Sequence, residues 1–236
     1  MLPKAIFFDL DDTLLAEDFY SEHAWQKSCE LFADKNQSIQ YHDLFNTINE
    51  VRRWYWDDTK RRKEGSLNLA QARTSIASMS LNRFGCDNRE LAEGIVADYT
   101  RLKDELLDFF PDVELILKEL VNQRIKLALL TNGNGASQRA KVNRFRLEKY
   151  FGVCLIEGEL GYGKPEPKIF ELALKSMHVT AEQTWMVGND LYFDIGGAQR
   201  LGIYSIWCDY GKKGLPEGSP IVPDKIINNI TELLSL

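Results

Sequence analysis

"AIFFDLDDTLL", residues 5–15, sets a run of apolar residues directly before three carboxylates. The run has the composition of a strand buried on both faces. Asp9 and Asp11 are two residues apart, so in an extended segment their side chains point to the same side. Two carboxylates placed in this way repel each other unless a cation lies between them. The stretch therefore predicts a buried strand that ends at a site for a divalent cation.

A simple turn is the alternative interpretation of the same residues. Asp11, Asp12 and Thr13 are common in turns and at helix starts, and a turn or cap accounts well for Asp12. It does not account for Asp9, which follows the apolar run and still belongs to the strand.

Strand-like and helical stretches alternate from about residue 100 onward. Short runs rich in Val, Ile, Leu and aromatic residues predict strands at 125–132, 152–158, 184–189 and 203–209, and a last short strand and helix after the loop 212–224. Apolar residues at helical spacing predict helices at 112–124, 137–151, 167–178 and 194–202. Such alternation is typical of an α/β fold whose core is a Rossmann-like parallel sheet.

Residues 16–95 interrupt this alternation with consecutive helical stretches and no credible strand. The economical interpretation is an all-helical domain, 16–95, inserted into an α/β core domain formed by 1–15 and 96–236.

Composition excludes several classes of protein. The 236 residues are 44% hydrophobic and 27% charged, as in ordinary globular proteins. A net charge of −6 argues against a protein that grips a nucleic-acid polymer, although a small anionic substrate is compatible with it. The first 15 residues carry neither an export signal nor a membrane span, so we expect a cytoplasmic protein without a membrane partner. The four cysteines lack the CxxC spacing of a zinc site.

Polar residues close each predicted strand, and in a parallel sheet these ends meet at one edge. The residues concerned are Asp9 and Asp11, Thr131 and Asn132, and Asn189, Asp190 and Asp194. The alternative interpretation of Asp194 is that it caps the helix predicted to follow. Together with a substrate phosphate, this oxygen-rich set is what Mg²⁺ prefers.

Lys164, in "GYGKPEPKIF", stands just before a predicted helix start. A lysine there opposes the helix dipole, so it is a poor structural choice unless an anion occupies the same place. A solvent-exposed lysine of little consequence is the alternative. If Lys164 balances the negative charge of Asp9 and of a bound phosphate, Lys164→Ala should damage turnover severely and leave stability almost unchanged.

These motifs together resemble the haloacid dehalogenase-like (HAD) hydrolase superfamily. "DLDDT", the threonine of "LLTNG", the lysine of "GKPEP" and the acidic "VGNDLYFD" occur in the family's order over nearly the whole chain. The helical insertion looks like the family's cap domain. The stretch "LLTNGNGASQRAKVNRFRLEKYFG" is most similar to the branch that includes N-acylneuraminate-9-phosphatase and pyrimidine nucleotidases.

The resemblance implies a role for each motif. Asp9 would be the nucleophile that becomes an aspartyl phosphate, and Asp11 the general acid and base. The phosphate would be bound by Thr131, Asn132 and Lys164. Mg²⁺, the implied cofactor, would be held by Asp9, the backbone carbonyl of Asp11 and an aspartate of the fourth motif.

The fourth motif departs from the usual pattern of this branch. Asn189 stands where many members have an aspartate, and Asp190 follows immediately. We therefore assign the third metal carboxylate to Asp190, with Asn189 and Asp194 beside it and Asp194 as an alternative ligand.

The sequence favours a phosphatase acting on a small phosphorylated metabolite over its rivals. A haloacid dehalogenase uses the same nucleophile without metal, but it needs no proton shuttle at Asp11. A non-catalytic binding protein is disfavoured by the intact Asp9, Thr131 and Lys164. A phosphotransferase is disfavoured because nothing in the sequence indicates that water is excluded.

A basic, aromatic stretch at 50–65 lies in the predicted cap. It could face a base or a sugar acid, but Trp54 and Trp56 are expected to pack the cap's own core, with Arg61, Arg62 and Lys63 as a solvated helix end.

Overall fold

The computed structural model describes residues 3–58, 60–61, 64–65 and 68–236. The chain divides into two compact units. The α/β unit comprises Met1–Ala16 and Phe109–Leu236, and the helical unit comprises Glu17–Asp108. Each has a hydrophobic core of its own. Of the residues predicted as a solvated helix end, Arg62 and Lys63 lie outside the described ranges.

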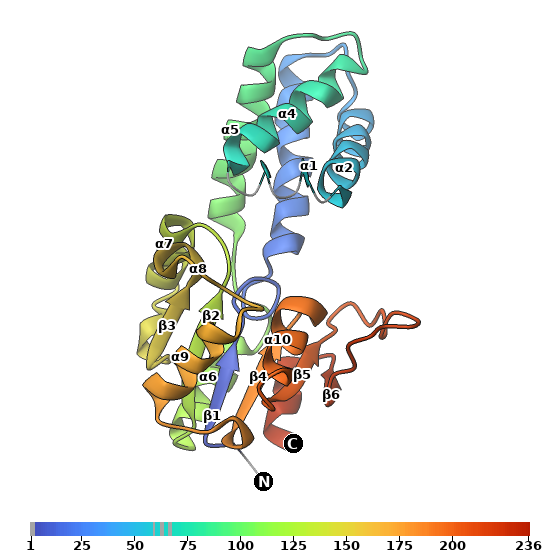
Figure 1. Cartoon of the computed structure of the whole chain (residues 1–236). Helices are drawn as coiled ribbons and strands as arrows, with labels where there is room; N and C mark the ends of the chain where they lie inside the picture. Colours follow the sequence, from blue (N-terminus) through green and yellow to red (C-terminus); the bar gives the residue numbers. More distant parts are fainter. Residues whose placement is uncertain (1–2, 59, 62–63, 66–67) are drawn as a thin grey trace. The chain divides into compact units, whose positions relative to one another are not determined.

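A parallel sheet of six strands in the order β3-β2-β1-β4-β5-β6 forms the centre of the α/β unit (Figure 1). The strands are β1 (Ala5–Phe8), β2 (Lys126–Thr131), β3 (Val153–Ile156), β4 (Thr184–Gly188), β5 (Tyr204–Cys208) and β6 (Lys225–Ile227). The quoted stretch supplies the central strand, since β1 pairs with β2 on one side and β4 on the other. All four residues of β1 are buried, as expected for a strand covered on both faces. The predicted α/β fold with a Rossmann-like parallel sheet is confirmed.

Helices lie between most of the strands of this unit, and one follows the last strand. They are α6 (Val113–Asn122), α7 (Gly135–Arg144), η1 (Leu147–Lys149), α8 (Glu157–Leu160), α9 (Pro167–Met177), η2 (Ala181–Gln183), η3 (Leu191–Gly196), α10 (Gly197–Gln199) and η4 (Ile230–Ser235). One face of β1 packs Phe7 into a cluster with Phe170 of α9 and Ala198 of α10. Phe8, which points to the other face, lies edge-on to Phe151 with ring centroids 6.1 Å apart.

Two of the predicted helices are not regular α-helices in the structure. The stretch predicted at 194–202 begins earlier, as the π-helix η3 followed by the short α10. The last predicted helix is the 3₁₀-helix η4. In the first case the helix begins at the cap residue Asp190, whose side chain accepts hydrogen bonds from two following backbone N–H groups.

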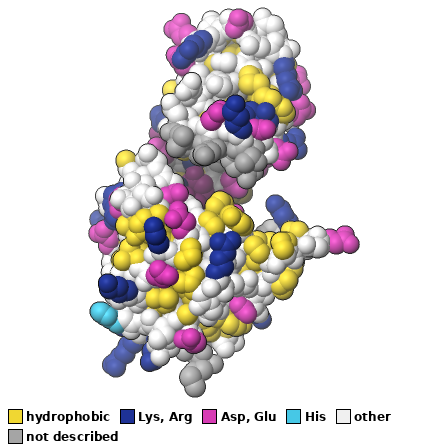
Figure 2. Space-filling model, in the orientation of Figure 1, with side chains coloured by type: hydrophobic (Ala, Val, Ile, Leu, Met, Phe, Trp, Pro, Cys, Tyr) yellow, Lys and Arg dark blue, Asp and Glu magenta, His cyan; other side chains and the backbone are white. Residues whose placement is uncertain are grey.

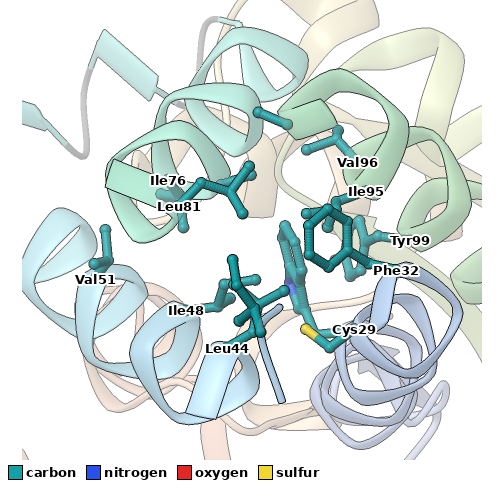
Figure 3. Packing of buried hydrophobic residues seen from close by; sticks show 14 of the residues in the cluster. Cys29, Phe32, Leu44, Ile48, Val51, Ile76, Leu81, Ile95, Val96 and Tyr99 are labelled. Carbon is teal, nitrogen blue, oxygen red and sulfur yellow. The ribbon is translucent and has the colours of Figure 1, made fainter. Parts of the chain in front are cut away.

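The helical unit contains α1 (Glu17–Lys35), α2 (Tyr41–Asp57), α4 (Leu69–Asn82) and α5 (Arg89–Leu106) among its described residues. Its core gathers apolar side chains from all four of these helices, including Leu44, Ile76 and Ile95 (Figure 3). At its centre Trp25 stacks on Tyr99, with ring centroids 4.1 Å apart. Trp56 packs against this cluster as expected, whereas Trp54 is 48% exposed.

The helical unit reaches further along the chain than predicted. The expected boundary at residue 95 falls inside α5, which belongs entirely to the helical unit. Ile95, Val96 and Tyr99 of α5 are buried in the core of that unit, so the helix cannot be divided. The turns of the chain at Leu15 and Phe109 meet in an antiparallel bridge, and Phe110 N donates to Leu14 O at 2.9 Å.

The described residues contain no helix that is both long enough and apolar enough to cross a membrane. On the face shown in Figure 2, Lys and Arg side chains are interspersed with Asp and Glu.

Candidate active site

Lys164 lies between two aspartates at the carboxyl ends of the strands. Its Nζ donates to Asp9 Oδ1 at 2.5 Å and to Asp194 Oδ1 at 2.7 Å. The three residues are 4%, 7% and 1% exposed, respectively. The alternative interpretation, in which Lys164 is exposed to solvent, is therefore wrong, because its ammonium is buried and paired with two carboxylates.

The charges of this buried group do not cancel. Burial disfavours the charged form of Lys164, but Asp194 and Asp9 together outweigh it and raise the pKa of the ammonium. Burial raises the pKa of the Asp194 carboxyl to about 7, against the attraction of Lys164, and the charge of Asp9 adds to the rise. Two carboxylates and one ammonium leave a net negative charge that a cation would offset.

Gly188 ends β4 and permits Asp194 to approach. A Cβ atom on Gly188 would lie 2.3 Å from Asp194 Oδ2, closer than atoms can approach. The same carboxylate oxygen accepts a hydrogen bond from Asp190 N at 2.9 Å. Glycine at this position therefore allows the carboxylate to reach Lys164 from the helix that follows the strand.

Asn132 was predicted to bind phosphate, but its side chain is engaged with the backbone of Lys164. Its Nδ2 donates to Lys164 O at 2.7 Å, and its Oδ1 accepts from Lys164 N at 2.8 Å. Gly163 leaves room for this contact, since a Cβ there would lie 2.5 Å from Asn132 Oδ1. The amide of Asn132 thus positions Lys164.

Asp190 and Asn189 have different surroundings. Asp190 Oδ1 accepts from Tyr192 N and Phe193 N, both at 2.7 Å, as the cap of η3. Asn189 Oδ1 lies 3.4 Å from Thr13 Oγ1, which in turn donates to Asp9 Oδ2 at 3.0 Å. The neutral amide therefore shares a neighbour with Asp9, and the carboxylate assigned to the metal caps a helix.

Asp11 contacts α7. Its Oδ1 accepts from Lys141 Nζ at 2.8 Å and its Oδ2 from Gln138 Nε2 at 2.8 Å. Asp12, the next residue, has a positive φ of 59° and takes part in a turn in which its N donates to Leu15 O at 2.7 Å. The turn expected at Asp12 is therefore present.

A family model described as haloacid dehalogenase-like hydrolase matches residues 3–202. The chain belongs to the haloacid dehalogenase-like hydrolases. A glyceraldehyde 3-phosphate phosphatase of Pyrococcus abyssi is 28% identical over 89% of this chain and 82% of its own length. The N-acylneuraminate-9-phosphatase of Rattus norvegicus is 28% identical over 99% of this chain and 93% of its own. The predicted family and branch are therefore confirmed.

Solved structures of other HAD-like hydrolases share the fold. The magnesium-bound HAD-hydrolase YfnB of Bacillus subtilis superposes with a TM-score of 0.74 at 20% identity, covering 100% of this chain and 98% of that one. A 2-haloacid dehalogenase of Pseudomonas syringae has a TM-score of 0.60 at 25% identity over 100% and 97% of the two chains.

Several residues of this HAD-like site were not predicted from sequence. Gln138 and Lys141 are three apart on α7, and this helical spacing was the available signal. Trp207 Nε1 donates to Asn189 O at 2.7 Å, and Tyr210 OH donates to Thr13 O at 2.9 Å. Both contacts are made to backbone carbonyls of other loops, for which a single sequence carries no signal.

Proposed function

We propose that this protein is a Mg²⁺-dependent phosphatase that hydrolyses small phosphomonoesters through an aspartyl phosphate on Asp9. The observation that carries the proposal is the buried contact of Lys164 with Asp9 at 2.5 Å and with Asp194 at 2.7 Å. A lysine held beside the nucleophile can neutralise a transferring phosphoryl group, whose charge is spread over its oxygens. The phosphatase names of the curated relatives support the same reaction class.

The donors around Asp9 fit Mg²⁺. Asp190 Oδ1 is already engaged as the cap of η3, whereas Asn189 Oδ1 lies near Thr13 Oγ1, a neighbour of Asp9. Asp9, the backbone carbonyl of Asp11 and the amide oxygen of Asn189 offer the oxygen ligands that Mg²⁺ accepts. We propose this set in place of one containing Asp190. When bound, the ion would offset the excess negative charge and polarise the phosphoryl oxygens.

The residues of the chain perform two chemical steps in this proposal. A carboxylate oxygen of Asp9 attacks phosphorus, and the bond from phosphorus to the leaving oxygen breaks as Asp11 donates its proton to that oxygen. Asp11 then accepts a proton from water, whose oxygen attacks phosphorus. The bond between phosphorus and Asp9 breaks, which releases inorganic phosphate and restores the carboxylate. Lys164 and Thr131 hold the phosphoryl group throughout.

The helical unit, Glu17–Asp108, is proposed to be the cap that selects the substrate. The candidate substrates are small phosphorylated metabolites such as sugar phosphates, nucleoside monophosphates and phosphorylated sugar acids.

A phosphate-release screen over these compounds, with Mg²⁺ and with excess chelator, tests the proposal. We expect release that needs Mg²⁺ and that disappears in Asp9→Asn, whose side chain is similar in size but cannot act as the nucleophile. Halide release from a 2-haloacid without metal, in the absence of phosphate release, would instead indicate a dehalogenase.

A further inference from the structure

Gln138 and Lys141 lie on one face of α7 and both reach Asp11. Lys141 Nζ donates to Oδ1 and Gln138 Nε2 donates to Oδ2, each at 2.8 Å. Each carboxylate oxygen thus has a donor of its own from the same helix. Two donors on separate oxygens fix the plane of a carboxylate, which a single contact would leave free to rotate.

Gln138 also ties Asp11 to the second strand. Its Nε2 lies 2.7 Å from Thr131 Oγ1 and 2.9 Å from Asn132 O, and the residue is only 4% exposed. One buried amide therefore sets the distance between Asp11 and Thr131, the residue proposed to hold the phosphoryl group.

Lys141 makes the charged contact to Asp11. The two side chains are 16% and 28% exposed, so water screens their attraction only in part. A hydrogen bond between an ammonium and a carboxylate is stronger than one from a neutral amide such as that of Gln138. Lys141 therefore supplies the stronger of the two contacts that hold the Asp11 side chain in place.

We propose that Lys141 and Gln138 are positioning residues that fix the orientation of the Asp11 side chain for hydrolysis of the aspartyl phosphate. This proposal rests on the proposed function and assigns two further residues to it. In the step concerned, a proton of water passes to Asp11 and the water oxygen bonds to phosphorus. The bond from phosphorus to Asp9 breaks, and its electrons return to the Asp9 carboxylate.

Rapid mixing of Lys141→Met with p-nitrophenyl phosphate and Mg²⁺ tests the proposal. Nitrophenolate is a good leaving group, so formation of the aspartyl phosphate needs little help from an acid. We expect the initial burst of nitrophenolate to stay within about 3-fold of wild type while steady-state kcat falls about 10²-fold, the scale of general-base catalysis. Phosphoenzyme trapped by acid quench should accumulate, and Lys141→Arg should restore part of kcat.

Arg139→Met is the matched control on the same helix. Arg139 is paired with Glu159 at 2.7 Å and Glu148 at 3.0 Å, and these contacts do not include Asp11. Its replacement removes ion pairs from α7 and should leave the ratio of burst to steady state unchanged. In the Asp11→Asn background, Lys141→Met should have no further effect beyond about 2-fold, because residues that act as a unit are not additive.

The outcomes separate this proposal from the proposed function. Three results for Lys141→Met would overturn the positioning role without affecting the proposed phosphatase activity. They are an equal loss of burst and steady-state rate, a rise in KM alone, and weaker inhibition by inorganic phosphate. No phosphate release from the wild-type protein would overturn both. If Lys141→Met does not fold, the same burst and steady-state measurements are made on Gln138→Met. An unchanged ratio of burst to steady-state rate in that variant would contradict the proposal.

Discussion

Lys164 combines a proposed catalytic role with a structural one. Its ammonium pairs with both Asp9 and Asp194, and all three side chains are buried. The expectation that Lys164→Ala leaves stability nearly unchanged was based on a lysine that opposes the helix dipole, and the buried ion pairs with Asp9 and Asp194 now argue against it. Removing one partner from a buried ion pair leaves an uncompensated charge.

We predict that Lys164→Met lowers the free energy of unfolding by about 3–5 kcal/mol, because Asp9 and Asp194 are left buried together. Turnover should fall by about 10²–10³-fold or more, the usual cost of losing a donor to a developing charge. Urea unfolding and phosphate release measure the two effects. The control is Lys126→Met, which loses a half-buried contact to Met177 O but no carboxylate. Equal stability losses in the two variants would contradict the role given to the buried pair.

Asn189 and Asp190 provide a second test, at the proposed metal site. We predict that Asn189→Asp lowers the Mg²⁺ concentration needed for half-maximal activity, since a carboxylate binds the ion more strongly than an amide. Asn189→Leu should raise that concentration. Asp190→Asn should have little effect on it, because an asparagine also caps a helix. Titration of activity with Mg²⁺ measures all three, and a requirement that follows Asp190 alone would restore the original assignment.

Among the helices, α6 is linked to η1 by Glu114. Hydrogen bonds from Lys149 and Tyr150, followed by Lys118, lower the pKa of the Glu114 carboxyl to about 2. The side chain is 44% exposed, so solvent limits the contribution to about 1 kcal/mol or less.

We predict that Glu114→Gln lowers the free energy of unfolding at pH 7, and that the difference from wild type shrinks as pH falls from 4.5 toward 2. A depressed pKa stabilises the folded state above the unfolded-state value, and this gain is lost as the carboxyl becomes protonated in both states. Urea unfolding at pH 7, 5 and 3 measures it. A difference that is constant with pH would indicate lost packing instead of lost charge.

The strands were predictable because their apolar runs are local signals. The α5 helix was divided by the predicted boundary because its buried face, formed by Ile95, Val96 and Tyr99, has meaning only against α1 and α4. The burial of Lys164 could not be predicted, since its partners are 155 and 30 residues away in sequence. Asn189 and Asp190 are adjacent, and the start of η3 decides which of them caps the helix. The exact start of a helix is difficult to predict from sequence, so the sequence prediction chose Asp190 where the proposed metal site contains Asn189.

The molecule has two separate cores. Trp25 is 2% exposed at the centre of the helical unit, and Phe170 is fully buried in the α/β unit. Because the two clusters share no residue, damage to one should open that unit before the other.

We predict that Trp25→Ala costs about 3–5 kcal/mol, the usual range for an aromatic residue in a core. Hydrogen exchange should rise in α1, α2, α4 and α5 while amides of β1, β2 and β4 stay protected. Phe170→Ala is the reciprocal control and should show the opposite pattern. Equal loss of protection in both units after Trp25→Ala would show that they unfold as one.

The place of β1 in the sheet has a consequence for the chain as it is synthesised. β1 is made first, yet its neighbours β2 and β4 begin at Lys126 and Thr184. At ribosomal speeds of about 5–20 residues per second, the strand waits roughly 10–40 s for both partners. All contacts within α1, α2, α4 and α5 are available earlier. On a translating ribosome, the helical unit should therefore be folded while "AIFF", the strand that precedes Asp9, is still an exposed apolar segment open to chaperones.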